Sequence, residues 1–143
     1  MTGTTITQYL NFGGRCEEAL EFYRKALGAE VEMVMRFNES PEQPPDGMLA
    51  AGYEKKIMHA SFRVRGVPLM ASDGCGEKSN FDGLRLALAV PKEADAHRAF
   101  NALADGGSVQ MPLSKTFWSP CYGMVTDRFG LGWMVTVHHA PES

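Results

Sequence analysis

The sequence lacks the features of several large protein classes. No apolar run approaches the roughly 20 residues of a membrane-spanning helix, and nothing at the N-terminus resembles a signal peptide. There is no run of basic residues, and the formal net charge of −3 argues against nucleic acid as a partner. These absences predict a cytoplasmic protein that binds neither a membrane nor a nucleic acid.

Cysteine is also scarce, since Cys16, Cys75 and Cys121 are odd in number, widely spaced and without a C-x-x-C pair. This spacing argues against a disulfide framework and against a zinc site made of cysteines. Cys16 falls in the first turn of an expected helix, where the helix dipole would lower the pKa of a thiol. It also falls on the apolar stripe of that helix, so we expect a buried Cys16, with a reactive thiol as the alternative.

What the sequence does contain is a strand–helix unit near its start and a weaker copy in its second half. The first helix has an apolar stripe at helical spacing, made of Cys16, Ala19, Leu20, Tyr23 and Leu27. Gly28 is placed to close it in a left-handed conformation. The copy has a stripe of Ala96, Ala99, Phe100 and Leu103, followed by Gly106 and Gly107. The chain is therefore built from two related units.

Strand-like sequence follows each helix. Alternation of apolar and polar residues predicts strands at 30–37, 56–64 and 67–73, with another at 84–90 before the second helix. Shorter strand-like pieces lie at 109–111, 115–118, 122–126 and 132–138. The proline-rich segment 38–55 is expected to be a long, mobile loop. The order is β-α-β-β-β twice, in one domain of residues 1–143 whose units span about 1–79 and about 80–143.

Two sets of motifs resemble a known superfamily. The helix Glu18-Ala19-Leu20-Glu21-Phe22-Tyr23, followed by Leu27-Gly28, and the turn Asp127-Arg128-Phe129-Gly130 are similar to the vicinal-oxygen-chelate superfamily of glyoxalases, bleomycin-resistance proteins and extradiol dioxygenases. More narrowly, its PhnB-like branch, whose members are often labelled 3-demethylubiquinone-9 3-methyltransferase-like, is resembled by four motifs in the right order: Tyr9 to Gly14, Met70-Ala71-Ser72-Asp73, Thr116-Phe117-Trp118 and Val125 to Gly130.

The resemblance implies an α+β fold in which two βαβββ units form an open, β-barrel-like cavity, and it implies a homodimer. Metal enzymes of the superfamily take ligands from the first and last strand of each unit. Gln8 matches one such position, but Arg85 stands at the equivalent position of the second unit, and Met134 or its neighbour Trp133 replaces the usual glutamate. Arginine and thioether groups do not suit a hard divalent ion, so we expect no metal and no other cofactor.

His59 is the candidate catalytic residue because it shares a strand face with Ser61 and Arg63, opposite an apolar face. It could instead be a metal ligand or a structural histidine. His97, His138 and His139 are expected at the surface.

The expected substrate-binding residues are Gln8, Arg85, Phe117, Trp118 and Met134. Arg85 has small strand neighbours and could bind a carboxylate, a phosphonate or an enolate. The alternatives are an internal ion pair of Arg85 with Asp73 or Asp127, and a core position for the two aromatic residues.

Three function classes compete. The first is a protein that binds a small anionic or oxygen-rich molecule without chemistry, and the second is a metal-dependent or acid–base enzyme of the glyoxalase or dioxygenase type. The third is a methyltransferase, which fits least, because Gly13-Gly14 lacks the G-x-G spacing of a nucleotide-binding turn and the strands alternate as in an antiparallel sheet.

Overall fold

The structure, a computed structural model, describes residues 3–76 and 78–138. The chain divides into two compact units, Met1–Ser79 and Asn80–Ser143, and each is described by itself. Both have one strand, one helix and three further strands in that order, which confirms the predicted α+β class with two βαβββ units. Within the described ranges, no helix has the length and apolar character needed to cross a lipid bilayer.

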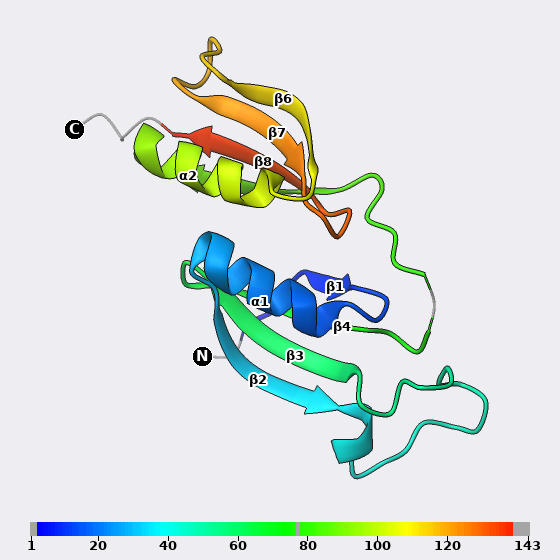
Figure 1. Cartoon of the computed structure of the whole chain (residues 1–143). Helices are drawn as coiled ribbons and strands as arrows, with labels where there is room; N and C mark the ends of the chain where they lie inside the picture. The colour runs from blue at the N-terminus through cyan, green and yellow to red at the C-terminus, as the bar shows by residue number, and fades with distance from the viewer. Residues whose placement is uncertain (1–2, 77, 139–143) are drawn as a thin grey trace. The chain divides into compact units, whose positions relative to one another are not determined.

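Unit 1 consists of β1 (Tyr9–Asn11), α1 (Cys16–Leu27), β2 (Glu30–Arg36), the 3₁₀ helix η1 (Phe37–Glu39), β3 (Ile57–Val64) and β4 (Val67–Ser72). Its sheet has the order β1-β4-β3-β2, in which β1 pairs with β4 in parallel and the other two pairs are antiparallel. Figure 1 shows α1 across one face of this sheet. The other face, called here the open face of unit 1, carries Tyr9, His59, Ser61 and Met70.

The apolar stripe of α1 is buried as predicted, and its five members are Cys16, Ala19, Leu20, Tyr23 and Leu27. Tyr23 stacks on Phe62 of β3, with ring planes 3° apart and centroids separated by 6.5 Å. Gly28 ends the helix with a φ of 73°, a left-handed conformation in which glycine has no steric penalty. The helix is therefore held to the sheet by the residues that its periodicity indicates.

The predicted alternation of β2 is wrong at one point. The pairing of β2 with β3 shifts register between Val31 and Met33, which leaves Glu32 as an extra residue. Val31 and Val34 consequently both lie on the side of α1, where they line a groove with Leu20. Strict alternation had placed them on opposite faces.

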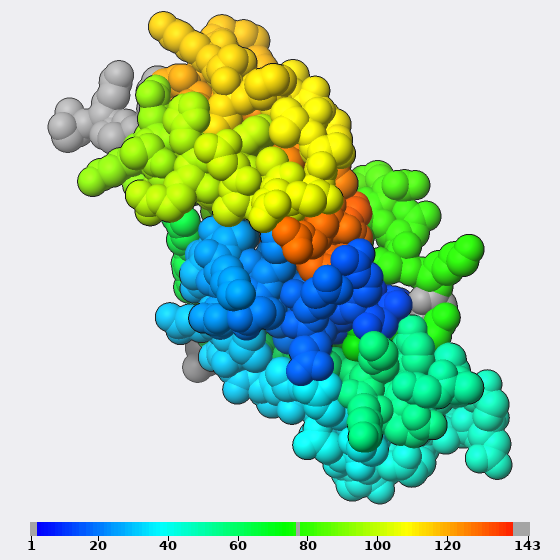
Figure 2. Space-filling model, viewed as in Figure 1, coloured from blue at the N-terminus to red at the C-terminus, as the bar shows by residue number. Residues whose placement is uncertain are grey.

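The segment between η1 and β3 contains no strand and no α-helix, as its prolines predict. Figure 2 shows it, in cyan to teal, at one end of unit 1. Main-chain hydrogen bonds fasten it at two places, from Asn38 to Glu54 at 2.8 Å and from Ala50 to Cys75 at 2.8 Å. The mobility of this segment remains a prediction. The two bonds hold Ala50 and Glu54, so we expect the motion to be largest between Ser40 and Ala50.

Unit 2 consists of β5 (Arg85–Val90), α2 (Glu93–Ala104), β6 (Ser108–Ser114), β7 (Tyr122–Thr126) and β8 (Gly132–Val137). Its sheet has the order β5-β8-β7-β6, and α2 covers one face (Figure 1) with its predicted stripe buried. Val125, Trp133 and Val135 are buried on that covered face. Since side chains alternate along strands, the open face of unit 2 carries Arg85, Ala87, Thr126 and Met134.

The strand predicted at 115–118 does not exist. β6 is one continuous strand that ends at Ser114, and the chain then makes a turn in which the Ser119 main-chain N–H donates to the Thr116 hydroxyl at 3.1 Å. Phe117 and Trp118 lie in this turn and are 96% and 50% exposed, so they are not core residues. Local hydrogen bonding of Thr116 competes here with strand pairing.

Candidate functional site

Unit 1 is organised around a buried carboxylate at the end of β4. Asp73 is 1% exposed and accepts three hydrogen bonds from main-chain N–H groups: Gly14 at 2.9 Å, Cys16 at 2.7 Å and Ile57 at 2.8 Å. Two of these donors belong to the start of α1, whose free N–H groups and dipole favour an anion. Asp73 therefore caps α1 from a distant strand and is committed to structure.

Cys16 lies directly beneath this carboxylate and is fully buried. Burial, and next the negative charge of Asp73, raise the pKa of the Cys16 thiol far above its ordinary value. The expected effect of the helix dipole is thus outweighed, because α1 already has its anion. The alternative of a reactive thiol is wrong, and Cys16 is a small core residue.

His59 is half-buried on the open face of unit 1, where it meets a residue that the sequence did not single out. Its Nδ1 lies 3.2 Å from the hydroxyl oxygen of Tyr9, and the two ring centroids are 5.7 Å apart. Tyr9 is 52% exposed, so the pair is accessible to solvent. A phenol and an imidazole at this distance can share or pass a proton.

Gln8 lies one residue before β1 and is exposed. It is held through its main-chain oxygen, which accepts a hydrogen bond from the Met70 N–H at 3.0 Å. Because side chains alternate along an extended chain, Gln8 shares its face with buried Leu10 and not with Tyr9. The structure therefore brings His59 together with Tyr9 and leaves the Gln8 side chain outside that pair.

Unit 2 also contains a buried aspartate, but its partners are local. Asp127 Oδ1 accepts hydrogen bonds from the N–H groups of Phe129 at 2.9 Å and Leu131 at 3.2 Å, and Oδ2 accepts one from Trp133 Nε1 at 2.9 Å. Asp127 therefore caps the turn that it begins. Trp133 is buried on the covered face. Of the two residues considered for the position of the usual glutamate, Met134 is therefore the one on the open face.

Arg85 begins β5 and lies opposite Gly132 of β8. The arginine is half-buried, and its Nη1 donates two long hydrogen bonds, 3.4 Å to the Val125 carbonyl and 3.5 Å to the Trp133 carbonyl. A Cβ atom at residue 132 would lie 2.9 Å from the Arg85 Cγ, so only glycine leaves room for the arginine to lie across β8. None of the ion pairs formed within residues 3–76 and 78–138 includes Arg85.

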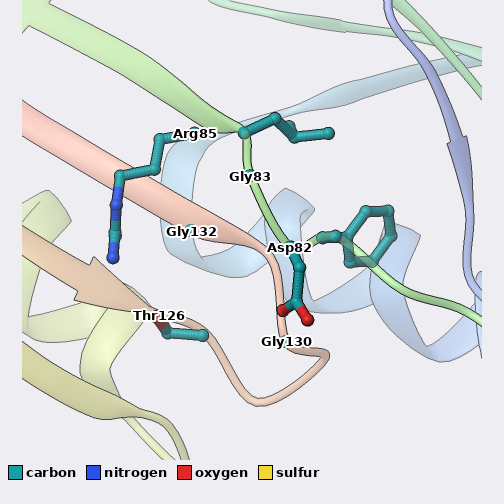
Figure 3. A pocket seen from close by; sticks show the side chains of 8 residues that line it. Asp82, Gly83, Arg85, Thr126, Gly130 and Gly132 are labelled. Carbon is teal, nitrogen blue, oxygen red and sulfur yellow. The ribbon is translucent and has the colours of Figure 1, made fainter.

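A pocket of about 370 Å³ surrounds this arginine within unit 2. Figure 3 shows the Arg85 side chain lying beside β8 and the Asp82 carboxylate turned toward Gly130. The pocket is also lined by Phe81, Gly83, Leu84, Thr126 and Gly132. A half-buried cation that donates to two carbonyl oxygens at long range, in a pocket lined partly by glycine, can accept an anion.

The other predicted residues of unit 2 surround this region less closely. Met134 is half-buried and lies opposite Ala87 on the open face. Phe117 and Trp118 form an edge-to-face pair with centroids 4.7 Å apart, and Trp118 packs in the same way on Tyr122 at 5.2 Å. This aromatic group lies on the turn before β7, and it does not line the pocket of Arg85.

Three further candidates were missed at the level of sequence: Tyr9, Asp82 and Gly132. Tyr9 is adjacent to Gln8, but its partner His59 is 50 residues away, so no local pattern could reveal the contact. Gly132 had a detectable signal, since glycine inside a strand often marks the close approach of another group. Asp82 lies in a glycine-rich joint where an acidic residue has no distinctive pattern.

Metal-ligand chemistry is sparse in the described part of the chain, where no group of three or more His, Cys, Asp and Glu side chains could hold an ion. His97 is exposed, as expected, and its Nε2 lies 4.0 Å from the Cys121 sulfur. Burial, and next the charge of Glu93, raise the pKa of Cys121, so this pair is not an activated thiol. His138 is exposed as expected, and His139 lies outside the described residues.

Comparisons with known proteins agree with this fold. Residues 4–136 match the family model described as 3-demethylubiquinone-9 3-methyltransferase. Protein PA1353 of Pseudomonas aeruginosa is 43% identical with a TM-score of 0.83, and the similarity covers 96% of this chain and 100% of that one. A PhnB protein of Bacillus cereus is 26% identical with a TM-score of 0.77, over 94% and 99% of the two chains.

A glyoxylase/bleomycin resistance protein/dioxygenase domain from Frankia sp. EAN1pec is 12% identical, with a TM-score of 0.63 over 96% and 98% of the two chains. At that identity the likeness is one of fold alone. The fold, the motifs and the family match agree. The chain belongs to the 3-demethylubiquinone-9 3-methyltransferase family, and it shares its fold with the glyoxylase/bleomycin resistance protein/dioxygenase domain.

Proposed function

We propose that this protein binds a small anionic or oxygen-rich organic molecule, and that Arg85 is the residue that anchors it. The observation that carries the proposal is the state of Arg85, a half-buried cation whose hydrogen bonds within the described part of the chain go to two carbonyl oxygens at 3.4 and 3.5 Å. Both bonds are long for N–H···O contacts. A carboxylate or phosphonate would offer the planar guanidinium two shorter, charge-assisted bonds in their place.

The residues near Arg85 on the open face suit an organic ligand. Ala87 and Met134 lie opposite each other and offer small and flexible apolar contacts. Phe117 and Trp118 lie outside the pocket of Arg85, and we propose that these exposed aromatic side chains offer a second, flat apolar surface for a ligand. Gln8 is proposed as an accessible hydrogen-bonding group on unit 1.

The divalent metal of the superfamily's enzymes does not fit these residues. The expected ligand positions hold a guanidinium at Arg85 and a thioether at Met134. Asp73, the carboxylate that follows β4 in unit 1, already accepts hydrogen bonds from three main-chain N–H groups. Hard ions need carboxylate, carbonyl or imidazole ligands. We therefore assign no step of binding to a metal.

The methyltransferase activity in the family's description would require an adenosyl cofactor, and the glycine turn of unit 1 does not fit one. The N–H groups of Gly13 and Gly14 already donate to Asn11 Oδ1 and Asp73 Oδ1, both at 2.9 Å. A Cβ atom at Gly14 would lie 3.0 Å from the Tyr53 hydroxyl, so that side is filled as well. The turn therefore has no free N–H groups for a nucleotide.

A second candidate function is proton-transfer catalysis, and the Tyr9–His59 contact favours it. A neutral imidazole whose Nδ1 accepts a hydrogen bond from the Tyr9 hydroxyl would present its Nε2–H to a ligand as a hydrogen-bond donor. In the other tautomer, Nε2 would be the base. Activity of this kind would disappear in His59→Gln and fall in Tyr9→Phe, whereas ligand binding through Arg85 would remain.

We propose a homodimer as the working assembly. The edge strands β2 and β6 expose Val31, Met33, Val109 and Met111, each between 36% and 46%. Exposed apolar edges are commonly covered by pairing with another chain. Light scattering is expected to give twice the 15.7 kDa chain mass, and a monomer at micromolar concentration would contradict this.

The test of the binding proposal is a thermal-shift and calorimetric screen at constant ionic strength with pyruvate, oxalate and methylphosphonate. At least one of these probes is expected to raise the Tm of the wild type and of Arg63→Met, a matched control at an exposed strand arginine. The same probe should leave Arg85→Met unshifted, although that variant folds. A shift that persists in Arg85→Met would overturn the proposal.

A further inference from the structure

The pocket of Arg85 contains an acidic residue in addition to the cation. We propose that its ligand is a zwitterion, a small organic anion that also has an ammonium group, with the anion on Arg85 and the ammonium on Asp82. The inference rests on the proposed function, because it names the ligand class of that same site.

Asp82 is exposed in the glycine-rich joint before β5, and its position is fixed locally. Its main-chain N–H donates to Asn80 Oδ1 at 2.7 Å, which sets the direction of the chain at this point. No ion pair formed among the described residues uses its carboxylate. Figure 3 shows that carboxylate turned toward Gly130, in a direction different from that of the Arg85 guanidinium.

Thr126 contributes an oxygen that can only accept. Its hydroxyl donates to Gln110 Oε1 at 2.9 Å, and Gln110 Nε2 donates to Ser108 Oγ at 3.0 Å, which fixes the orientation of the amide. With its proton committed, the Thr126 oxygen has lone pairs left for a donor. The pocket therefore combines one strong donor, Arg85, with two acceptors, Asp82 and Thr126.

This combination decides between a simple anion and a zwitterion. A ligand with negative charge alone would satisfy Arg85 but would also face the Asp82 carboxylate, and like charges across a binding site oppose binding. A ligand that also has an ammonium group pairs with both. The volume of about 370 Å³ lies near the lower end of the roughly 300–1,000 Å³ of ligand pockets, so the molecule is small.

Three glycines line the pocket, and two of them have a positive φ. Gly83 and Gly130 have φ values of 84° and 86°, a backbone conformation that other residues adopt at a cost. Gly132 admits the Arg85 side chain. Leu84, which also lines the pocket, is 45% exposed and offers an apolar surface for the methylene groups of a short chain.

Calorimetry at neutral pH with matched probes tests the inference. Glycine, β-alanine and γ-aminobutyrate are compared with acetate, propionate and butyrate, which lack the ammonium, and with ethylamine, propylamine and butylamine, which lack the carboxylate. The best amino acid is expected to bind the wild type about tenfold more tightly than its matched carboxylate. Asp82→Asn should bring this ratio near one without weakening carboxylate binding, and Arg85→Met should abolish binding of both.

The outcomes separate the two proposals. An unchanged ratio in Asp82→Asn, or a wild type that prefers the carboxylates, would overturn the zwitterion and leave anion binding intact. Amines that bind as tightly as the amino acids would overturn it too, because Arg85 would then contribute nothing. Unaltered binding in Arg85→Met, or no binding by any probe, would overturn both proposals.

Discussion

The two units have the same element order and the same strand order, yet they use their buried aspartates in opposite ways. Asp73 joins the start of α1 to the start of β3, so its partners belong to separate elements. The three hydrogen bonds described above for the Asp127 carboxylate go to Phe129, Leu131 and Trp133, all within the next six positions. A common topology thus rests on a long-range fastening in unit 1 and on a local one in unit 2.

The open faces differ as well. That of unit 1 has a tyrosine–histidine pair, and that of unit 2 has an arginine beside glycine and alanine. In both sheets the covered face is filled by aliphatic and aromatic side chains that pack on the helix. The covered faces therefore determine the fold, whereas the open faces are free to acquire different chemistry.

The sharpest test of the comparison replaces each aspartate by alanine. Asp73→Ala leaves three main-chain donors without an acceptor in separate elements, and it is expected to lower the free energy of unfolding by about 3–4 kcal/mol. Asp127→Ala should lower it by about 2 kcal/mol, because its turn can open locally while the sheet persists. Urea unfolding followed by circular dichroism measures both.

Fluorescence provides the control, because Trp118 and Trp133, the two tryptophans of the chain, are both in unit 2. Asp127→Ala should change the fluorescence transition at once, since Trp133 loses its partner. A larger destabilisation by Asp127→Ala than by Asp73→Ala would contradict the distinction between long-range and local fastening.

The second test changes the position of Arg85 on the open face of unit 2 and leaves unit 1 unchanged. Gly132→Ala places a Cβ atom 2.9 Å from the Arg85 Cγ, and the flexible arginine is expected to swing away at little cost in stability. Affinity for an anionic probe should fall about three- to tenfold, which corresponds to roughly 1 kcal/mol. Gly3→Ala is the matched control, because nothing lies within 4 Å of a Cβ atom there.

The third test asks whether the open face of unit 2 can be given a metal site. The wild-type protein is expected to purify with much less than one divalent ion per chain, because Arg85 and Met134 are not ligands for hard ions. Met134→Glu adds a carboxylate on that face and should raise the zinc or nickel retained, as measured by elemental analysis. Stoichiometric metal in the wild type, lost in Gln8→Ala or His59→Ala, would contradict the prediction.

The smallest expected effect concerns two ion pairs at the surface, one in each unit. Arg36 pairs with Glu17 of α1 at 2.7 Å, and Arg128 pairs with Asp105 after α2 at 3.3 Å. Removal of either arginine is expected to lower the free energy of unfolding by about 0.2–1 kcal/mol, since both pairs are solvent-exposed. Chemical denaturation of Arg36→Ala and Arg128→Ala measures the two costs.

The Arg36 pair also has a pH signature. Its hydrogen bond lowers the pKa of Glu17, so the contribution is present above the ordinary glutamate pKa of about 4.3 and is lost as pH falls through the lower value of the folded protein. Arg36→Ala should therefore differ from the wild type at pH 7 and converge with it in acid. A difference that persists unchanged at low pH would contradict this assignment.

The sequence predicted the helices well because a period of 3.6 residues is a local signal. The stripes of α1 and α2 and the closing Gly28 are confirmed. The errors lie where pairing between distant segments decides the outcome. Glu32 is an extra residue only with respect to the pairing of β2 with β3. Phe117 is exposed because it lies in the turn between Thr116 and Ser119, which has no periodic pattern.

The candidate site was less predictable than the fold for the same reason. Arg85 could be selected from its small strand neighbours, but the glycine that admits it is 47 positions further along, at 132 − 85. The contact between Tyr9 and His59 spans 50 positions. Such contacts exist only once the sheet has formed, so composition and spacing cannot reveal them.

The Asp73 cap also has a consequence for the order in which unit 1 can form. Its carboxylate follows Cys16 by 57 residues, so a ribosome delivers α1 long before it delivers the acceptor for that helix's first N–H groups. At about 5–20 residues per second the delay is roughly 3–11 s. Throughout that interval α1 is an amphipathic helix without its cap, and unit 1 becomes stable only when β4 arrives.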